Sequence, residues 1–479
     1  MSRPTSTVLL LLLVIALAVD VHAQRPAPAE GRDMRLVGHD DLQARSAYQP
    51  VIHRQGARFI AYVGHHGGLK MNPLTARDEL NGTSIVDVTD PARPQYLHHI
   101  PGAPGAAEAG GASMVRLCDG ATLPGADRQK TYLLRTLGNL AHEVWDVSDP
   151  RRPALVTTVV SGLNGTHKNW WECDSGIAYL VSDGRPQGWR TNRMTKIFDL
   201  SDPARPRHIR DFGLTGQEPG SSGAKAPEGV HGPIAYKNRV YFAYGTGADG
   251  ILQIVDRDRL LAGDPASGER FAPTPQNLRY PEVGRLEMSP AWGGHTSFPV
   301  LGLRVPEFAA NAKGQVRDFV VLVSESLANE CQEFRQLTFM VDVTTESRPF
   351  SVSTFDVPAA SGDFCRRGGR FGPHSSHESF TPIYYGKLVF IAYFNAGVRA
   401  VDIRDPFHPR EVGFFIPAVT PNTDKRCVKV ADGERCKVAI QTNNVEVDDR
   451  GYVYLADRAN TGLHIVELTG AARSIAGLP

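Results

Sequence analysis

One short pattern recurs along the chain and constrains its fold more than any other feature. An apolar-Asp-apolar run is followed by Ser/Thr-Asp-Pro-x-x-Pro, as in IVDVTDPARP, VWDVSDPRRP and IFDLSDPARP. A fourth strong copy is VRAVDIRDPFHP, and three weaker copies keep the acidic position. Aligned on that acid, the copies are at Asp87, Asp146, Asp199, Asp256, Asp342, Asp402 and Glu467. Successive copies are far enough apart to hold one repeat unit of about 40 to 50 residues each.

The chemistry of the pattern predicts strands separated by a tight turn. Alternating apolar residues before the acid are typical of a half-buried strand. Asp accepts hydrogen bonds from nearby backbone N–H groups and Pro fixes the next φ, so Asp-Pro-x-x-Pro predicts a turn. An apolar segment such as PQYLHHI then predicts a further strand, and a paired run such as GPIAYKNRVYFAYG lies upstream. Each unit is therefore expected to contain four antiparallel strands.

Units of this kind predict a ring. A four-stranded unit cannot bury both of its faces alone, whereas a closed ring of units can. We therefore expect an all-β fold: a single seven-bladed β-propeller over residues 34–479 with four-stranded antiparallel blades. Because the last copy has no convincing strand after Thr469, the N-terminal strand MRLVGHDDL is expected to close the ring as the outer strand of blade seven. A Pro-rich insertion is expected at Asp264–Glu287. The alternative, a pair of β-sandwiches, needs two cores.

The repeated strings resemble those of the LVIVD-repeat family of exported bacterial β-propeller proteins. The resemblance covers the chain from about Met34 to Thr469, with four strong copies and three degenerate ones. It implies the propeller architecture and says little about chemistry.

The first residues are typical of a signal peptide. Arg3 supplies a positive start, Val8–Val19 is almost wholly apolar, and cleavage is expected near Ala23. The apolar run is shorter than the about 20 residues that cross a bilayer, and an uncleaved anchor is the alternative. We expect residues 1–23 to be removed, residues 24–33 to form a flexible mature N-terminus, and the protein to be secreted or periplasmic without a membrane span.

Charge and motifs exclude several classes of function. The formal net charge is +1 with acidic and basic residues interspersed, so no nucleic-acid partner is expected. The sequence has no P-loop and no GxGxxG in a βαβ context, so no nucleotide cofactor is expected. GxSxG and HExxH signatures are also missing from the sequence.

Six cysteines in an exported chain favour disulfide bonds over thiolate chemistry. Cys427 and Cys436 flank a short loop and are expected to pair. Six cysteines allow 15 connectivities, so the rest stays open. Cys118 and Cys173, in the matching contexts RLCDG and WECDSG, are expected to lie side by side on neighbouring blades. Cys331 and Cys365 both fall in loops between successive repeats.

Four histidines occupy equivalent positions at the starts of the inner strands of four consecutive units. They are His167, His231, His295 and His377. Four imidazoles that converge on one axis suit a borderline transition metal, so the predicted cofactor is a single Zn, Fe, Cu or Mn ion. The alternatives are hydrogen-bonded structural histidines, or a polar pocket without metal. The matching positions in the other units are Tyr48, Ser113 and Asn443.

Further polar residues are expected on loops of the same face, behind the metal ligands or facing a substrate. They are His374, Glu378, Glu172, His65, His66, Glu325, Asp183, Asp457 and Arg458. His374 could replace His377 as the ligand, and Glu378 or Glu172 could orient an imidazole through its second nitrogen. Each of these residues could equally be a solvated loop residue.

These features predict a propeller that binds a transition metal and acts on a small molecule or oligosaccharide at the mouth of its channel. The chemistry expected is that of a metal-dependent oxidoreductase or lyase/hydrolase, with no catalytic residue indicated. The alternative is a non-catalytic binding or scaffold propeller that recognises a peptide, glycan or protein partner. The sequence indicates neither the substrate nor the oligomeric state.

Overall fold

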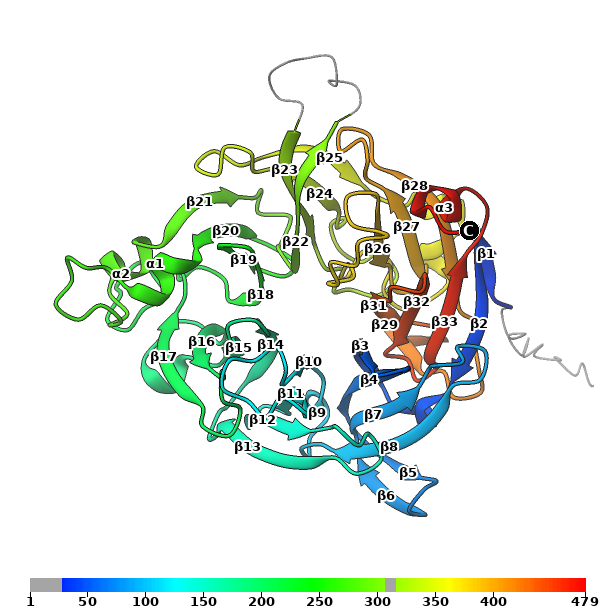
Figure 1. The fold of residues 1–479 in the computed structure, drawn as a ribbon. Helices are drawn as coiled ribbons and strands as arrows, with labels where there is room; N and C mark the ends of the chain where they lie inside the picture. Colours follow the sequence, from blue (N-terminus) through cyan, green and yellow to red (C-terminus); the bar gives the residue numbers. More distant parts are fainter. Residues whose placement is uncertain (1–27, 306–315) are drawn as a thin grey trace, which may run out of the picture.

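The computed structural model describes residues 28–305 and 316–479. The expected signal peptide, residues 1–23, lies outside the described residues. Within the described ranges the strands form six four-stranded sheets, one five-stranded sheet and two two-stranded hairpins. The main sheets are antiparallel and are arranged around a common axis, which makes the molecule a β-propeller (Figure 1).

Five sheets each use strands from one continuous part of the chain, ordered from the innermost strand outward. The first is β3 (Ala47–Gln55), β4 (Arg58–Gly67), β7 (Gly82–Asp87) and β8 (Gln95–Pro101), with β9 (Ala107–Ala112) paired to β4. The second is β10 (Val115–Asp119), β11 (Thr131–Leu137), β12 (Ala141–Asp146) and β13 (Ala154–Val160). The third is β14 (Thr166–Trp171), β15 (Ile177–Ser182), β16 (Met194–Asp199) and β17 (Arg207–Phe212). The fourth is β18 (Val230–Tyr236), β19 (Arg239–Tyr244), β20 (Ile251–Asp256) and β21 (Glu282–Glu287). The fifth is β22 (Thr296–Arg304), β23 (Val316–Val323), β24 (Thr338–Asp342) and β25 (Phe350–Phe355).

Two sheets combine C-terminal strands with a strand from the N-terminal region. One is β26 (Leu388–Ala392), β27 (Val398–Asp402) and β28 (Arg410–Ile416), with β1 (Glu30–Arg32) on the outer edge. The other is β31 (Thr442–Val447), β32 (Tyr452–Asp457) and β33 (Gly462–Leu468), with β2 (Met34–Asp40) outermost. In the latter pairing Met34 lies opposite Leu468 and Asp40 opposite Leu463. Residues 30–32, which the sequence analysis placed in a flexible segment, therefore form a paired strand.

The remaining elements are insertions and short helices. The hairpins are β5 (Leu69–Asn72) with β6 (Arg77–Leu80), and β29 (Lys425–Val430) with β30 (Gly433–Val438). The helices are α1 (Arg257–Ala262), α2 (Pro275–Arg279) and α3 (Gly470–Ala476), besides short 3-10 turns. The insertion expected at Asp264–Glu287 contains α2, but its last six residues are the outer strand β21. None of the helices within the described ranges is long and apolar enough to cross a bilayer.

The acids of the repeat cap the turns that join the third and fourth strands. The Asp87 carboxylate accepts the Thr89 N–H at 2.9 Å, and the Asp90 carboxylate accepts the Ala92 N–H at 3.1 Å. The same pair of contacts recurs at the turn that begins at Asp146. Asp is favoured there because its short side chain bonds the backbone two residues on. This confirms that the repeated string encodes a strand, a turn and a strand.

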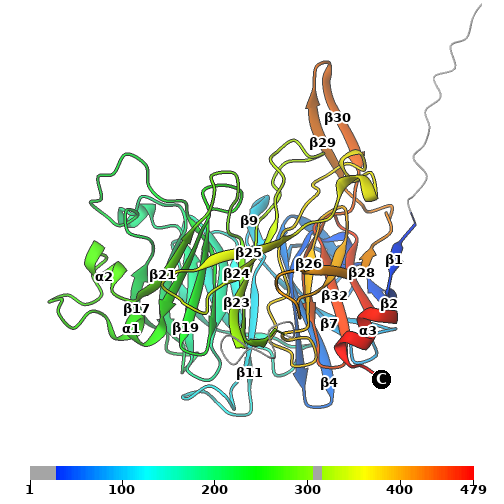
Figure 2. The ribbon, with the colours of Figure 1, turned by 90° about the horizontal axis from the view of Figure 1, so that it is seen from above.

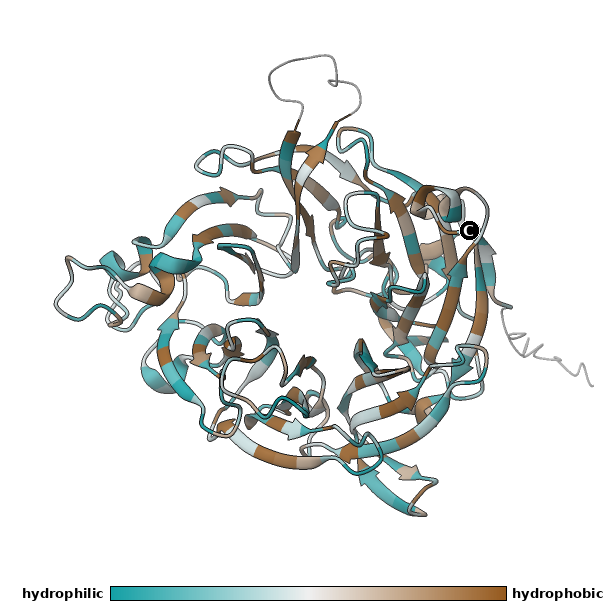
Figure 3. Cartoon of the chain, in the orientation of Figure 1, coloured by the Kyte–Doolittle hydropathy of each residue, from teal (hydrophilic) through white to brown (hydrophobic). Residues whose placement is uncertain are grey.

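Apolar side chains of neighbouring sheets pack against each other to form the core. One cluster joins Tyr241 and Leu252 of the fourth sheet to Val320 and Leu322 of the fifth, all at most 1% exposed. Figure 3 shows hydrophobic residues on the strands and hydrophilic ones mainly on the connecting loops. Burying such sheet faces is the main stabilising contribution of the ring, at roughly 25 cal/mol per Å² of apolar surface.

Three disulfides are formed. The pairs are Cys118–Cys173, Cys331–Cys365 and Cys427–Cys436. The pairing expected between Cys427 and Cys436 is confirmed, and so is the proximity of Cys118 and Cys173. The bond between Cys118 and Cys173 joins the second and third sheets at their inner strands.

Candidate functional site

The inner strands begin with an irregular pairing that changes which side chains face the axis. In β18, Val230 pairs with Tyr244 and Gly232 pairs with Ala243, so His231 is an extra residue. The same one-residue shift occurs in three other inner strands, between Ala47 and Pro50, Thr166 and Asn169, and Thr442 and Asn444. A β-bulge redirects side chains that a regular strand would alternate between its two faces. Successive residues such as His167 and Lys168 can then both face the axis.

Four imidazoles meet where these inner strands begin. His167 Nε2 lies 2.6 Å from His231 Nε2. The His231 and His295 rings have centroids 3.5 Å apart, and the His295 and His374 rings 4.3 Å. All four side chains are at most 4% exposed. The structure thus brings together three of the four aligned histidines, and the fourth member of the cluster is His374.

His377 lies elsewhere. Its Nδ1 accepts the Phe390 backbone N–H at 3.1 Å, and its ring packs 5.0 Å from the Phe298 ring. Burial lowers its pKa to about 4. The segment around residue 376 pairs with β26 through an isolated bridge to Ile391 and a few backbone hydrogen bonds, so it lacks the regular inner strand on which the alignment of the repeats relied. His377 is thus a buried neutral side chain away from the cluster.

Hydrogen bonds to backbone carbonyls fix the tautomers of two cluster histidines. His231 Nδ1 donates to the carbonyl of His295 at 2.8 Å, and His374 Nδ1 donates to the carbonyl of Asn443. A carbonyl oxygen can only accept, so each neutral imidazole carries its proton on Nδ1 and a lone pair on Nε2. Burial lowers the pKa of both imidazoles well below the usual value, so they are neutral. The Nε2 lone pairs of His231 and His374 are therefore available to bind a metal ion.

Glu325 adds a carboxylate to the same space. Its oxygens lie 3.5 Å from His374 Nε2 and 3.9 Å from His295 Nε2. Three potential ligand atoms lie within 4.8 Å of one another: a ring nitrogen of His231, a ring nitrogen of His295 and a carboxylate oxygen of Glu325. His295 Nε2 is buried and has no hydrogen-bond partner among the described residues. Several acceptor atoms thus face one point, an arrangement that a bound cation would stabilise.

A second set of residues surrounds the cluster. His66 and Tyr48 face it, with ring centroids 4.6 Å apart, and Tyr48 lies 5.7 Å from the His374 ring. Glu108 lies 3.8 Å from His167 Nδ1. The remaining members are three arginines, Arg193, Arg370 and Arg458, which form ion pairs with Glu108 or Glu325. The set makes the polar wall of the site.

Other residues singled out in the sequence have structural partners away from the cluster. Glu172 pairs with Arg257 at 2.7 Å, and His65 bonds the Ser84 hydroxyl at 2.8 Å. Asp183 pairs with Arg185. Asp457 accepts the backbone N–H groups of Gln441 and Ala459 and so shapes a turn. The structure therefore brings together His374, His66, Glu325 and Arg458 from the wider sequence-based set.

Glu378 lies in a separate charged network that crosses the channel. Its carboxylate pairs with both Lys168 and Arg116, which come from two other sheets. These two cations hold the Glu378 pKa down at about 2 despite burial. Lys168 reaches across because Gly232 leaves room, since a Cβ there would lie 2.5 Å from Lys168 Cδ. The network borders a cavity of about 160 Å³ that is also lined by Trp170 and Glu446.

Glu446 gives the network a dependence on pH. Burial, with the Glu378 charge, raises its pKa to about 7, against about 4.3 in an unfolded chain. The folded protein thus keeps this proton between pH 4.3 and 7, and the stability that the proton confers is lost as pH rises through 7.

The unsubstituted protein is therefore expected to lose up to about 3 kcal/mol of its free energy of unfolding between pH 5 and 8 through Glu446. Glu446→Gln is expected to abolish this loss, because the amide is neutral at both pH values. Urea unfolding at pH 5 and at pH 8 measures this change in stability. Glu411→Gln is the control and should keep the pH dependence of the unsubstituted protein. Identical pH dependence in Glu446→Gln and the unsubstituted protein would contradict this assignment.

Several members of the site carry no signal in the repeat. Glu108 is in β9, Arg370 is in the link before β26, and Arg193 directly precedes β16. These segments differ in length between units, so alignment on the repeat does not bring them into register. Lys168 and Glu446 could have been found, because they lie one and three residues after the aligned positions His167 and Asn443.

Long links rise from the face that carries the cluster. The hairpin β29–β30 projects from one face of the ring (Figure 2). Its base contacts the site directly, because Arg426 donates to the Arg458 carbonyl at 3.2 Å. The Cys427–Cys436 bond and an ion pair between Arg435 and Glu330 hold it. The cluster therefore lies beside a rigid projection.

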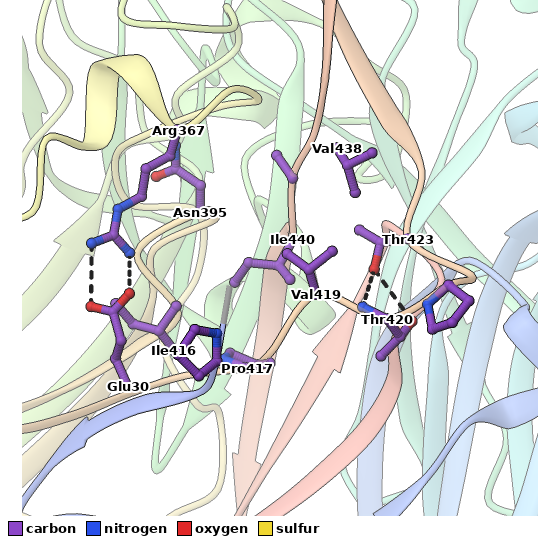
Figure 4. A pocket seen from close by; sticks show the side chains of 13 residues that line it. Glu30, Arg367, Asn395, Ile416, Pro417, Val419, Thr420, Thr423, Val438 and Ile440 are labelled. Atoms are coloured by element: carbon purple, nitrogen blue, oxygen red, sulfur yellow. Dashed lines mark hydrogen bonds and ion pairs between the residues drawn. The ribbon is translucent and has the colours of Figure 1, made fainter. Parts of the chain in front are cut away.

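A larger cavity lies near the edge of the ring rather than on the axis. It has a volume of about 520 Å³ and is lined mainly by apolar groups, including Ile416, Val419 and Ile440. Figure 4 shows the ion pair between Glu30 and Arg367 at one end of it. No histidine lines this cavity. The ligand atoms grouped at His231, His295 and Glu325 therefore do not belong to this cavity.

Comparisons with known proteins support the repeat and the fold. A family model described as "LVIVD repeat" matches residues 384–416, which contain β26–β28. No curated protein matches the sequence. Raptor from Chaetomium thermophilum is similar in structure, with 11% identity and a TM-score of 0.52, over 93% of this chain and 30% of that chain. This chain thus spans 30% of the length of Raptor, and at this identity the likeness concerns the fold alone.

Two smaller proteins match at lower TM-scores. The Cps50 (Swd1) β-propeller domain from Myceliophteria thermophila has 10% identity and a TM-score of 0.46, over 88% of this chain and 96% of that chain. Sqt1 from Chaetomium thermophilum, bound to the N-terminus of ribosomal protein L10, has 10% identity and a TM-score of 0.49, over 90% and 99%.

Proposed function

We propose that this chain is a binding propeller whose recognition site contains one transition-metal ion. His167, His231, His295 and His374 supply nitrogen ligands, and Glu325 supplies an oxygen ligand. Zn, Fe, Cu and Mn are the candidate ions, because imidazole and carboxylate together suit them. The ligand is a small molecule or glycan that enters at the mouth of the channel.

The orientation of the imidazoles is the observation that supports this proposal. The Nδ1 atoms of His231 and His374 donate to carbonyls, so their Nε2 lone pairs point at the other ligand atoms. Hydrogen bonds of this kind orient the histidines of metal sites and make them stronger ligands. Burial keeps all four imidazoles neutral, which is the form that binds a metal.

The architecture and location belong to the same proposal. The seven main sheets act as seven blades, and β2 closes the ring by completing the sheet of β31–β33. The N-terminal residues direct export and are cleaved near Ala23. Three disulfides support an oxidising compartment, where such bonds persist.

A metal-free binding or scaffold propeller is the second candidate. The hairpin β29–β30 favours it, because a rigid projection beside the axial site offers a contact surface for a peptide, glycan or protein partner. In this alternative the histidines form a polar pocket. A metal-dependent oxidoreductase, lyase or hydrolase activity stays a prediction. Turnover of a substrate that stops when a chelator is added would establish it.

Metal analysis of the purified mature protein tests the main proposal. We expect about one equivalent of a single transition metal, because ligand atoms of His231, His295 and Glu325 lie within 4.8 Å of one another, with His167 and His374 beside them. The His231→Ala/His295→Ala variant should lose the metal, since it removes two of the three ligand atoms that lie together. His208→Ala, at an exposed histidine paired with Asp211, is the control and should keep it. Less than about 0.2 equivalents in the unsubstituted protein, still unchanged after incubation with each candidate ion, would leave only the metal-free candidate.

A further inference from the structure

Three guanidinium groups share two carboxylates beside the histidine cluster. Arg193 pairs with Glu108 at 3.2 Å, and Arg370 pairs with Glu325 at 2.9 Å. Arg458 Nη2 lies 4.0 Å from Glu108, too far for a hydrogen bond. The arginines come from different links of the ring, and they converge on the space above the imidazoles.

Arg458 has an unused donor in this space. Its Nη1 atom is buried and has no hydrogen-bond partner among the described residues. A guanidinium keeps its charge in proteins, and a buried charged donor without a partner is costly. Such a group is stabilised when an anion from outside the chain completes its hydrogen bonds.

The balance of charge points the same way. Three arginines and two glutamates leave one net positive charge, because the neighbouring imidazoles are neutral. A divalent metal ion would raise that to three. Uncompensated positive charge in a desolvated site is unfavourable, so the site is complementary to an anion.

Solvent can reach the arginines but not the imidazoles beneath them. The Glu108 side chain is 41% exposed, Arg193 26%, Arg370 24% and Arg458 13%. The imidazoles are at most 4% exposed. A ligand that approaches from solvent thus meets the guanidinium groups first and the proposed metal last.

We propose that the molecule bound at this site carries an oxyanion group, a carboxylate, phosphate or sulfate, that lies between Arg458 and the metal. Arg458 donates from Nη1, while Arg193 and Arg370 contribute positive charge from the rim. Tyr48, whose ring lies 5.7 Å from the His374 ring, carries a hydroxyl that can donate a further hydrogen bond. Planar guanidinium groups suit the paired oxygens of such an anion. This inference rests on the proposed metal site and names the class of its ligand.

Titration calorimetry with the metal-loaded protein tests the proposal, using inorganic phosphate, sulfate and acetate as separate probes. We expect at least one probe to bind at one site per chain, and the preferred probe identifies the oxyanion. Arg458→Leu should weaken that binding roughly tenfold to a hundredfold, as expected for loss of a charged hydrogen bond. Arg458→Lys should weaken the binding of the anion less than Arg458→Leu does. Both variants should keep their metal. Arg205→Leu, at an exposed arginine of a repeat turn, is the control.

The outcomes separate this inference from the proposed function. Full metal content without binding of any probe would overturn the oxyanion site and leave the metal site standing. Equal anion binding with and without metal would overturn the placement of the anion between Arg458 and the ion. Absence of metal in the unsubstituted protein would defeat both proposals together. Equal affinity in Arg458→Leu and Arg205→Leu would also overturn the inference.

Discussion

Glu378→Gln is expected to lower the free energy of unfolding by about 3–5 kcal/mol, the range for breaking one partner of a buried ion pair. The substitution leaves Lys168 and Arg116 without a counter-charge. Water cannot replace it fully, because both side chains are at most 10% exposed. Arg116 and Lys168 come from the inner strands of the second and third sheets and Glu378 from the link before β26, so the loss affects contacts between distant parts of the ring. Urea unfolding followed by tryptophan fluorescence measures the change, because Trp170 lies 4.9 Å from the Arg116 guanidinium.

Two further variants make the test specific. Glu467→Gln removes the partner of Arg35, whose side chain is 72% exposed, and should change stability by less than about 1 kcal/mol. Lys168→Met combined with Glu378→Gln should recover part of the loss, because one unpaired charge is removed with its partner. A Glu378→Gln variant as stable as Glu467→Gln would mean that the network is solvated and not buried.

Replacing Cys118 and Cys173 with Ala is expected to destabilise the protein by about 4 kcal/mol, from the chain entropy that a loop of this length restores to the unfolded state. The two cysteines are 55 residues apart and join neighbouring sheets at their inner strands. Thermal unfolding of the double variant, compared with the unsubstituted protein under oxidising conditions, measures the loss.

The hairpin disulfide supplies the matched control. Cys427 and Cys436 are nine residues apart and lie within the projecting hairpin β29–β30. Their replacement should have a smaller effect on the ring, because the hairpin can open while the sheets stay packed. If both double variants unfolded at the same temperature, the bond between the second and third sheets would not restrain the ring as we infer.

The repeat made much of the fold predictable. Each strong copy combines a period-two apolar run with Asp and Pro at fixed offsets, and both signals are local. The all-β propeller and the third and fourth strands of the units followed from these copies. The strand Glu30–Arg32 did not, because the three-residue segment Glu-Gly-Arg is too short to show a periodicity, and its partners Glu411 and Arg367 are far away in the sequence.

The site was predictable only as far as the repeat reaches. His167, His231 and His295 lie at aligned positions, and the structure brings them together. The alignment chose His377 over His374 because it assumed a regular inner strand, whereas this segment forms no regular strand and pairs with β26 only irregularly. Arg193 and Arg370 were missed because they belong to links whose lengths follow no common rule. Their convergence depends on tertiary packing, which a single sequence does not encode in any short pattern.

The pairing of β2 with β33 has a consequence for how the molecule is made. Residues near opposite ends of the chain share one sheet, with Arg35 opposite Glu467. That sheet cannot form until the ribosome has synthesised the last strand, so β2 must wait unpaired while every other unit is completed. Contacts of such long sequence separation form slowly. Assembly of this sheet is thus postponed until β33 has been synthesised, so the complete arrangement of sheets forms only after this long-range pairing is made.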